Sequence, residues 1–590
     1  MTYCRLFLFG LLTAALAVPP AFSNPVDDAF QVLDLANLTA GVDPYIRVTV
    51  PGGELRLGSF GVPVAGGLDV DGDGFADSAF SHMTASPQGR FVAGELRLIF
   101  GDGSVRDAID TSTPHPRVLR ILGASQLEVT GSEIWIGDVT GDGLGDVLIC
   151  RQGLSPDGRT GAGGLTLLPG GPALRNLAGS GGVLDLAAPP PGLEGLTLVG
   201  PTENARLGMW ARVGDVDGDG VDDLVVAADQ ESEGGEIHRG ALYVVRGGAH
   251  LANPGVVDLA DFGSTSLAGL VARVTPPTGS HEYHFGSTNQ LGDLDGNGRA
   301  EILASAALNR AGAVLGPPNI FSGHSVGGAP AGKAFILWDD LFPTGPWPAG
   351  FEIDLDNPPG SVTVISGGVR NETFGEELLG GADYDGDGHA ELLVGDLTGD
   401  PDPGRENAGL GYAIFRAEKI KGLSFNIDDP PPGLRVTTFE GPVAGAIGSD
   451  TVAQGDFDDD GFDDLVVGNP HDNPTGRLSA GSLHVIFGRP GGWPRLLDTQ
   501  PGALPPNSLV RITELWGANG RTGPTDRGDT LCYSAAAGDM NGDGRTDLIT
   551  NEMIGNGVTP GSTDTGNLVI FDGELLSPPR FGLGGGPPSP

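Results

Sequence analysis

The chain has 590 residues, a formal net charge of −43 at pH 7 and three cysteines. So large a negative charge argues against binding to nucleic acid or to an anionic lipid surface, because both would repel the protein. The cysteine count excludes a disulfide-rich scaffold, so packing or bound metal must supply the stability. Cys150 and Cys532 are expected to be two separate buried thiols, with a bridge between them as the less favoured alternative.

Residues 1–23 resemble a secretory signal peptide. Arg5 supplies a positive start, Leu6 to Val18 an apolar core, and Ala21-Phe22-Ser23 a small-x-small cleavage site. No later stretch approaches eighteen apolar residues, so no membrane span is expected. We therefore predict a secreted, periplasmic or cell-surface associated protein whose mature chain begins near Asn24.

One motif then returns seven times along the chain. Its pattern is Asp-x-Asp/Asn/Thr-x-Asp/Asn-Gly-x-x-Asp/Glu, beginning at Asp69, Asp138, Asp215, Asp293, Asp383, Asp456 and Asp539. Oxygen-bearing side chains recur at positions one, three, five and nine, the backbone carbonyl of position seven can add another oxygen, and glycine at six permits a sharp turn. Calcium accepts six to eight oxygen ligands in flexible geometry, whereas magnesium demands a stricter octahedron. The motif therefore predicts up to seven calcium ions and no other cofactor.

The predicted metal residues are positions one, three, five, seven and nine of each loop. They are Asp69, Asp71, Asp73, Phe75 and Asp77; Asp138, Thr140, Asp142, Leu144 and Asp146; Asp215, Asp217, Asp219, Val221 and Asp223; Asp293, Asp295, Asn297, Arg299 and Glu301; Asp383, Asp385, Asp387, His389 and Glu391; Asp456, Asp458, Asp460, Phe462 and Asp464; Asp539, Asn541, Asp543, Arg545 and Asp547. Loops with three carboxylates, at Asp138, Asp293 and Asp539, are expected to bind more weakly than those with four.

An EF-hand is excluded because it needs a bidentate Glu at position twelve. That position holds Phe80, Ile149, Val226, Ala304, Val394, Val467 and Thr550. Each loop is followed instead by a short apolar run that is typical of a buried strand. The loops therefore connect strands.

The spacing of the motif predicts the architecture. It recurs about every 78 residues, so seven units fill residues 24–575 and leave no room for a separate catalytic domain. Each unit has a Phe-Gly-like pair and a strand before the loop, a strand after it, a glycine-led strand, and a short strand that ends in an apolar-Asp pair. Four strands per unit are typical of a propeller blade. We predict an all-β fold, a seven-bladed β-propeller with calcium-binding loops.

Both ends of the mature chain have predicted roles. No apolar-Asp strand follows Phe571, but Val32-Leu33-Asp34-Leu35 lies alone ahead of the first loop. We expect this N-terminal strand to complete the seventh blade and close the ring, which removes a sheet edge that would invite aggregation. Residues 576–590 form a Gly/Pro-rich tail that is expected to be flexible.

The units resemble a known family. Pairs such as Phe60-Gly61, Phe285-Gly286 and Phe374-Gly375, followed by the acidic loop and a glycine-led strand, resemble the FG-GAP repeats of the integrin alpha-subunit N-terminal β-propeller and its secreted bacterial relatives. The resemblance implies calcium in the loops of one rim and a partner on the other face. The pair is degraded in two repeats, where Thr130-Gly131 and Arg527-Gly528 take its place. Because stalk domains and a membrane span are not seen, a stand-alone secreted propeller is expected.

Three functions remain open at this point. The first is an adhesion or interaction module that binds an extracellular protein or glycan and is expected to be a monomer. The second is a secreted enzyme that acts on polysaccharide or another polymer in the central depression, which would show as non-loop carboxylates or histidines converging on the axis. The third is a calcium-dependent surface-layer or matrix component, which would self-associate.

Other candidate motifs are weak. His281-Glu282-Tyr283-His284 lacks the spacing of a zinc protease helix and is expected to be a surface loop. Arg527-Gly528-Asp529 is a tripeptide that some integrins bind, but its place in the repeat favours coincidence. The long Ser305 to Gly332 segment and Trp516 to Thr530 are the best candidates for a partner surface, with an insertion of no binding role as the alternative. We predict no catalytic residue.

Overall fold

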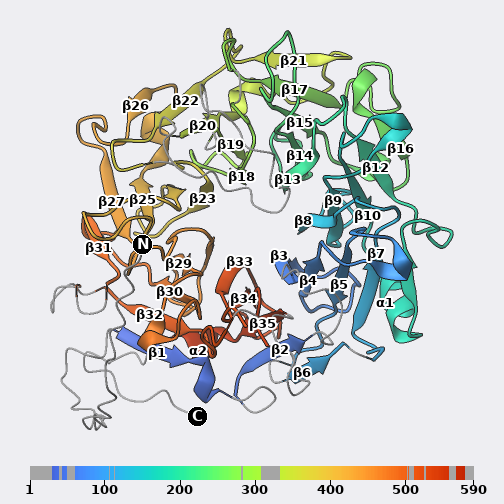
Figure 1. Cartoon of the computed structure of the whole chain (residues 1–590). Coiled ribbons are helices and arrows are strands. Elements are labelled where there is room, and N and C mark those ends of the chain that lie inside the picture. Colours follow the sequence, from blue (N-terminus) through green and yellow to red (C-terminus); the bar gives the residue numbers. More distant parts are fainter. Residues whose placement is uncertain are drawn as a thin grey trace, which may run out of the picture.

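The computed structural model describes residues 30–38, 43–49, 60–104, 107–111, 113–280, 283–306, 332–371, 373–500, 503, 510–523, 526–556 and 566–577. The predicted signal peptide, most of the tail and most of the 305–332 segment lie outside these residues. Seven five-stranded sheets surround a common centre (Figure 1). The prediction of an all-β, seven-bladed β-propeller is confirmed.

Blades are numbered here by the order of their acidic loops and described from the innermost strand outward. Blade 1 contains β3 (Phe60–Leu68), β4 (Asp77–His82), β5 (Glu95–Ile99), β7 (Val118–Leu122) and β11 (Val183–Asp185). Blade 2 contains β8 (Thr130–Gly137), β9 (Asp146–Arg151), β10 (Gly164–Leu168), β12 (Leu196–Val199) and β16 (Gly255–Asp258). Blade 3 contains β13 (Leu207–Gly214), β14 (Asp223–Ala228), β15 (Ala241–Val245), β17 (Val271–Thr275) and β21 (Phe351–Asp354).

The remaining blades repeat this order. Blade 4 contains β18 (Asn289–Gly292), β19 (Glu301–Ser305), β20 (Lys333–Leu337), β22 (Val362–Ser366) and β26 (Ser424–Asn426). Blade 5 contains β23 (Glu377–Ala382), β24 (Glu391–Asp396), β25 (Leu410–Phe415), β27 (Arg435–Glu440) and β31 (Leu496–Asp498). Blade 6 contains β28 (Val452–Gly455), β29 (Asp464–Asn469), β30 (Ser482–Ile486), β32 (Ile512–Trp516) and β1 (Phe30–Asp34). Blade 7 contains β33 (Leu531–Gly538), β34 (Asp547–Glu552), β35 (Asn567–Phe571), β2 (Tyr45–Thr49) and β6 (Asp107–Asp110). Among the described residues, the α-helix α1 (Pro172–Gly179) lies in the connection between β10 and β11, and the α-helix α2 (Gly573–Leu576) follows β35.

The prediction of four strands per blade is wrong. The apolar-Asp strands do not complete their own unit; each reaches back and pairs in parallel with the fourth strand of the preceding blade, as β11 does with β7 and β16 with β12. The sequence shows a strand at these places but not its partner. Each repeat therefore donates one strand to its neighbour.

The predicted place of the N-terminal strand is also wrong. Residues 30–34 form β1, which pairs with β32 in blade 6 and not in blade 7. Blade 7 receives a different N-terminal strand, β2, which pairs with β35. The last repeat lacks its own fourth strand and the strand that it would donate to blade 6, so β2 and β1 from the start of the chain take these two places. The fifth strand of blade 7, β6, is donated by the first repeat as elsewhere in the ring. The N-terminal and C-terminal segments thus share two sheets.

The hydrophobic core lies between neighbouring blades. Val226 and Ala228 of blade 3, for example, belong to one buried cluster with Cys150 and Leu165 of blade 2. Strands such as β4 and β14 are buried along their whole length, which explains their continuous apolar runs. Cys150 and Cys532 are both free and buried, as expected.

A glycine directly before the third strand of a blade sets the distance to the next blade. A Cβ on Gly163 would lie 2.3 Å from the backbone nitrogen of Leu207 in the next blade, and the same clash recurs at Gly94, Gly240, Gly409 and Gly481. Any side chain there would push the blades apart.

These contacts also locate the Phe-Gly-like pair. In blade 7 the residue that meets the glycine is Leu531, followed by Cys532 with a φ of 64°. In blade 6 it is Gly448, followed by Ser449 with a φ of 65°. The assignment of Arg527-Gly528 to this place is therefore wrong. A second interpretation of the sequence, that Ile447-Gly448 takes this place in blade 6, is wrong by one residue. The sequence does not indicate the true positions, because the second residue of each pair is Cys532 or Ser449 and not the glycine that this backbone conformation favours.

A recurring ion pair ties the donated strands in place. Arg90, Arg159, Arg405 and Arg477, each in the connection between second and third strands, contact Asp185, Asp258, Asp498 and Asp34 of the outermost strand. The Arg90 and Arg159 pairs are bidentate, with distances of 2.6 to 3.0 Å. The Arg477 to Asp34 pair, at 2.8 Å, holds the N-terminal strand.

The blade-to-blade glycine can be tested by Gly163→Ala. We expect it to lower the free energy of unfolding by about 3 kcal/mol more than Gly158→Ala, because overpacking is added to backbone strain. Gly158 is a matched control, since its φ of 83° is close to the 79° of Gly163 but a Cβ there meets nothing within 4 Å. Equal losses in denaturant unfolding would contradict this role.

The ion pair on the N-terminal strand can be tested by Asp34→Asn. A partly exposed ion pair contributes up to about 1 kcal/mol, so local opening of residues 30–34 should increase. Hydrogen exchange followed by mass spectrometry measures this opening. Asp185→Asn is the control, since it removes the same kind of pair from β11 and should leave exchange in β1 unchanged. Unaltered exchange in β1 of Asp34→Asn would refute the proposed role.

Candidate metal-binding loops and central cavity

The seven acidic loops share one backbone conformation. Each joins the innermost strand of a blade to the second strand, so all seven lie at the same face of the ring. The position-one carboxylate accepts hydrogen bonds from loop N–H groups, as Asp69 does from Gly72 at 2.6 Å and Gly74 at 2.7 Å. The glycine at position six has a positive φ in every loop, between 81° and 95°. The predicted sharp turn is confirmed.

The position-nine carboxylate fixes the loop to its blade. Asp77 accepts hydrogen bonds from the N–H groups of Val70 and Gly101, each at 2.8 Å. Burial raises the pKa of Asp77 to about 8 and the pKa of Asp464 to about 9 despite such bonds, and neighbouring loop carboxylates add to the effect. Bringing these acids together therefore has an electrostatic cost that a cation would offset.

Five loops bring three carboxylates to one point. In the groups Asp69, Asp71 and Asp77; Asp215, Asp217 and Asp223; Asp293, Asp295 and Glu301; Asp383, Asp385 and Glu391; and Asp456, Asp458 and Asp460, one oxygen of each residue lies within 4.8 Å of the others. The loops at Asp138 and Asp539 are not among the described groups of this kind, and both lack a carboxylate at position three, where they have Thr140 and Asn541. The presence of a carboxylate at position three, rather than the total number of carboxylates, thus distinguishes the five loops that form such a group from the other two.

The donor set fits a hard cation. All ligand atoms in these groups are carboxylate oxygens, which calcium prefers. Oδ1 of Asp295, Oδ1 of Asp385 and Oε1 of Glu301 are buried and accept no hydrogen bond from any described group. A buried acceptor without a donor is costly, so these oxygens point to a positively charged ligand. The five acidic clusters are compatible with Ca²⁺.

A basic side chain contacts the position-three carboxylate in each of these five loops. The pairs are Arg175 with Asp71, Arg246 with Asp217, Lys421 with Asp295, Arg435 with Asp385, and Arg511 with Asp458. Lys421 lies 3.0 Å from Asp295 and also contacts Asp339 at 3.2 Å. These cations offset part, but not all, of the negative charge of each loop.

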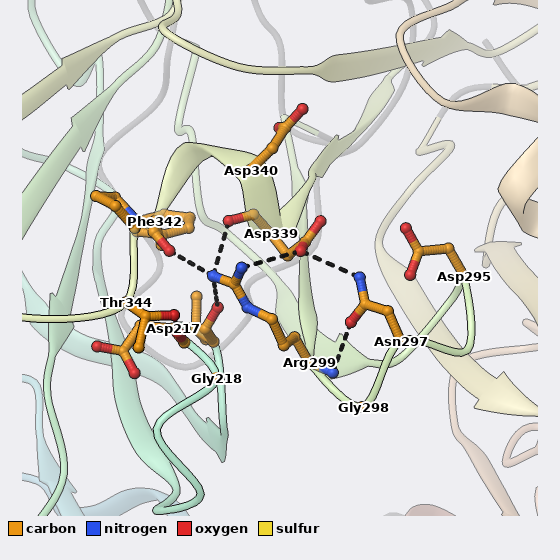
Figure 2. Close-up of polar contacts among 12 residues, drawn as sticks. Asp217, Gly218, Asp295, Asn297, Gly298, Arg299, Asp339, Asp340, Phe342 and Thr344 are labelled. Atoms are coloured by element: carbon orange, nitrogen blue, oxygen red, sulfur yellow. Dashed lines mark hydrogen bonds and ion pairs between the residues drawn. The ribbon is translucent and has the colours of Figure 1, made fainter.

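Neighbouring loops are also linked through position seven. The Arg299 guanidinium donates to the backbone carbonyls of Val216, Asp339 and Phe342 and forms an ion pair with Asp339 at 3.2 Å (Figure 2). Its side chain covers Gly218, the fourth residue of the preceding loop, where a Cβ would lie 2.7 Å from Arg299 Cδ.

The same arrangement recurs around the ring. The position-seven side chains of Leu144, Val221, Phe462 and Phe75 lie against the position-four glycines Gly72, Gly141, Gly386 and Gly542. The side chain of position seven thus contacts the neighbouring loop. Whether its backbone carbonyl also binds metal remains a prediction.

A cavity of about 390 Å³ lies where the seven innermost strands meet. Its polar lining includes Glu133, Glu376, Glu377, Asp450 and Arg212. The lining residues outside these strands, such as Met83 and Gln152, come from connections on the face opposite the acidic loops. Sequence analysis did not identify this site, because the strands that supply it are far apart in the chain.

Arg212 stands among the aromatic residues of this cavity. It pairs with Glu133 at 2.6 Å, and its guanidinium lies 4.2 Å from the ring centroid of Trp135 and 5.1 Å from that of Trp210. Burial raises the pKa of Glu133 to about 7 although Arg212 opposes the shift. The indole Nε1 of Trp210 is buried and donates to no described acceptor.

The structure shows where the acidic residue of the Arg527-Gly528-Asp529 tripeptide lies. Asp529 of the Arg527-Gly528-Asp529 tripeptide is fully buried and accepts a hydrogen bond of 2.6 Å from the backbone of Asn519. A receptor cannot reach such a carboxylate, so the expectation of coincidence is confirmed. His281 and Glu282 lie outside the described residues, whereas Tyr283 and His284 are buried, so the expectation of a surface loop is wrong for these two. Most of the 305–332 segment also lies outside the described residues, so that candidate partner surface stays a prediction.

None of the described helices is long and apolar enough to cross a membrane. Fold and site together define a seven-bladed β-propeller with acidic loops on one face. The model of the FG-GAP repeat family matches residues 207–245, 450–486 and 533–571, which cover the first three strands of blades 3, 6 and 7, in that order. Three of the seven blades thus contain FG-GAP repeats.

Several known proteins share part of the sequence. Phosphatidylinositol-glycan-specific phospholipase D of Rattus norvegicus is 28% identical over 30% of this chain and 18% of its own length, and the Bos taurus protein is 29% identical over the same shares. Integrin alpha-PS2 of Drosophila melanogaster is 30% identical over 22% of this chain and 9% of its own length. The chain thus spans less than a fifth of these curated relatives.

A solved structure, the rhamnogalacturonan lyase of Bacillus licheniformis, aligns with 88% of this chain and 91% of its own. Its TM-score is 0.22 and its sequence identity is 13%. A TM-score this low supports no conclusion about fold or function.

Burial of the tripeptide can be tested by comparing Asp529→Ala with Arg527→Ala. Loss of the buried acceptor should lower the free energy of unfolding by about 1 to 3 kcal/mol. The exposed Arg527 should change it by less than about 0.5 kcal/mol. Denaturant unfolding gives both values. Unchanged stability in Asp529→Ala, together with lost binding to a receptor for this tripeptide, would show that the motif is functional.

Proposed function

We propose that this protein is a secreted, calcium-binding β-propeller that acts as an adhesion or interaction module for an extracellular protein or glycan. The observation that carries the proposal is the convergence of three carboxylates in each of five loops, with buried oxygens that lack hydrogen-bond donors. Calcium bound at these points would neutralise negative charge of the carboxylates on the face where the seven loops lie. The FG-GAP repeats support the same function, since integrin alpha-PS2 carries similar sequence.

The opposite face is the better candidate for the partner surface. Large exposed apolar side chains occur in its connections, among them Phe91, Leu127, Ile237, Val369 and Leu478. Val369 is 97% exposed, and Phe91 lies beside Leu127, whose N–H donates to the Phe91 carbonyl at 2.9 Å. A contiguous exposed apolar patch marks an interaction site, so the neighbouring side chains of Phe91 and Leu127 are the part of this face most suited to contact a partner.

Calcium binding can be tested by removal of the metal. We expect about five ions per chain in the loaded protein and a large fall in melting temperature on chelation, because the loop carboxylates would then repel one another. Each site at 100 times its Kd contributes about 2.7 kcal/mol. Equilibrium dialysis with metal analysis and calorimetry give the two numbers. Fewer than two ions, with an unchanged melting temperature, would refute the metal assignment.

Two substitutions test which loops bind. Asp71→Asn should lower the stoichiometry by one ion, because it removes the position-three carboxylate of a convergent group. Thr140→Asp should raise it by one, because it supplies the missing carboxylate in the loop at Asp138. Asp157→Asn, at an exposed position of the opposite face, is the control for the change in charge. An unchanged stoichiometry in both loop variants would show that position three is not a ligand.

A second candidate function is that of an enzyme acting on polysaccharide or another polymer in the central cavity. One observation favours it: four carboxylates outside the loops, Glu133, Glu376, Glu377 and Asp450, line that cavity. Release of reducing ends from polysaccharide, lost in Glu377→Gln, would support this function. Binding of polymer without cleavage would favour the interaction module.

A further inference from the structure

One part of the central cavity is lined by aromatic and uncharged polar side chains. This aromatic sector consists of Trp135 and Gln152 from blade 2, Trp210 from blade 3 and Gln290 from blade 4. The innermost strands of these blades, β8, β13 and β18, follow one another around the ring (Figure 1). The four side chains therefore border the same side of the cavity.

The innermost strand of blade 3 presents two large side chains to the cavity. The register between β13 and β14 shifts between Leu207 and Ala211, which indicates a β-bulge in β13. Met209 and Trp210 lie within this bulge, and both line the cavity. A bulge re-aims side chains out of the regular alternation of a strand, so two consecutive residues face the same space.

One guanidinium group holds both tryptophans of the aromatic sector. The Arg212 guanidinium lies 4.2 Å from the ring centroid of Trp135 and 5.1 Å from that of Trp210. Its Nη1 atom donates to Glu133 at 2.6 Å and to the Ala211 carbonyl at 2.8 Å. Because a cation is attracted to the faces of aromatic rings, this arrangement fixes the two indoles before any ligand binds. Such preorganisation lowers the entropic cost of binding.

Four hydrogen-bonding groups at this side of the cavity have no partner among the described residues. The indole Nε1 of Trp210 is buried and donates to no described acceptor, and the same holds for Nε of Arg212, a residue that is only 6% exposed. The side-chain amides of Gln152 and Gln290 form no hydrogen bond with another described residue. A buried donor without an acceptor is costly, so these groups point to a ligand that supplies hydrogen-bonding atoms.

The distribution of charge indicates an uncharged ligand. The described lining contains two arginines and no lysine, and each arginine is paired with a carboxylate, Arg212 with Glu133 and Arg206 with Asp229. An anionic ligand would therefore find no unpaired cation in this lining. The groups without partners are two N–H donors and two carboxamides, which both donate and accept. Hydroxyl groups, which also donate and accept, are the matching partners.

A sugar ring combines such hydroxyl groups with an apolar face of C–H groups, and an indole ring offers a flat apolar surface beside its N–H donor. The cavity volume of about 390 Å³ is within the usual range of small-molecule sites. We propose that the aromatic sector binds a neutral sugar residue of a glycan, with Trp210 as the stacking side chain and Gln152 and Gln290 as hydrogen-bonding partners. This site would give the interaction module its ligand, so the inference rests on the function proposed for the protein.

The first experiment is a glycan array probed with the full chain in calcium-containing buffer, followed by fluorescence titration with the methyl glycoside of the terminal sugar that is bound. We expect binding to neutral glycans, a change in indole emission on titration, and no binding to glycans that end in a uronic acid. Binding to no neutral glycan, or to uronic acids only, would overturn the proposal. Saturable binding of the tripeptide Gly-Gly-Gly in place of sugars would also overturn it, because the site would then recognise a peptide backbone.

Two variants test the residues. Trp210→Phe keeps an aromatic ring but removes the indole N–H, so the affinity for the methyl glycoside should fall about threefold to tenfold. The double variant Gln152→Ala with Gln290→Ala removes two hydrogen-bonding groups and should lower the affinity at least about tenfold. Gln500→Ala, at an exposed site, is the control and should bind normally. Unchanged affinity in both test variants would refute the assignment.

Calcium stoichiometry measured on the same preparations separates the two proposals. Bound calcium without sugar binding would contradict the sugar site alone. Sugar binding that is lost in the test variants, in a protein that binds no calcium, would support the sugar site and contradict the metal assignment. Melting temperatures of the variants show whether a loss of affinity is accompanied by a loss of folded protein.

Discussion

The close approach of neighbouring blades is the constraint on which the rest of the structure depends. At Gly163 and its equivalents, the backbone of one blade touches the backbone of the next, with no space for a side chain. This contact sets the radius at which the innermost strands meet. The size of the central cavity and the spacing of the acidic loops both follow from that radius. A repeat protein built from such nearest-neighbour contacts gains stability blade by blade.

The acidic loops add further contacts between neighbouring blades at one face of the ring. The carboxylates of positions one and nine accept backbone hydrogen bonds within the blade, and in four of the five convergent loops they also bring an oxygen to the same point as position three. Side chains at position seven then contact the preceding loop, as Arg299 does at Gly218. A cation bound in one loop would therefore stabilise more than its own blade.

The two faces and the centre of the ring offer distinct chemistry. One face is acidic and suited to metal, the other carries exposed apolar residues such as Val369, and the centre combines carboxylates with Trp135 and Trp210. Because the curated relatives overlap with only part of this chain, their activities do not decide among these sites. The distribution of charge and apolar surface in the molecule itself makes the distinction.

The sequence by itself determined the repeat, the number of blades, the acidic loops and their turns, because these depend on residues close together in the chain. Spacing of Asp and Gly within nine residues is enough to define a loop such as Asp215 to Asp223. Only the tertiary structure decided which blade receives β1, and that each outermost strand comes from the next repeat. It also decided that Asp529 is buried and that Glu133, Glu377 and Asp450 line one cavity. Strand pairings of this kind join residues that are far apart in the chain, and a local pattern carries no record of its distant partner.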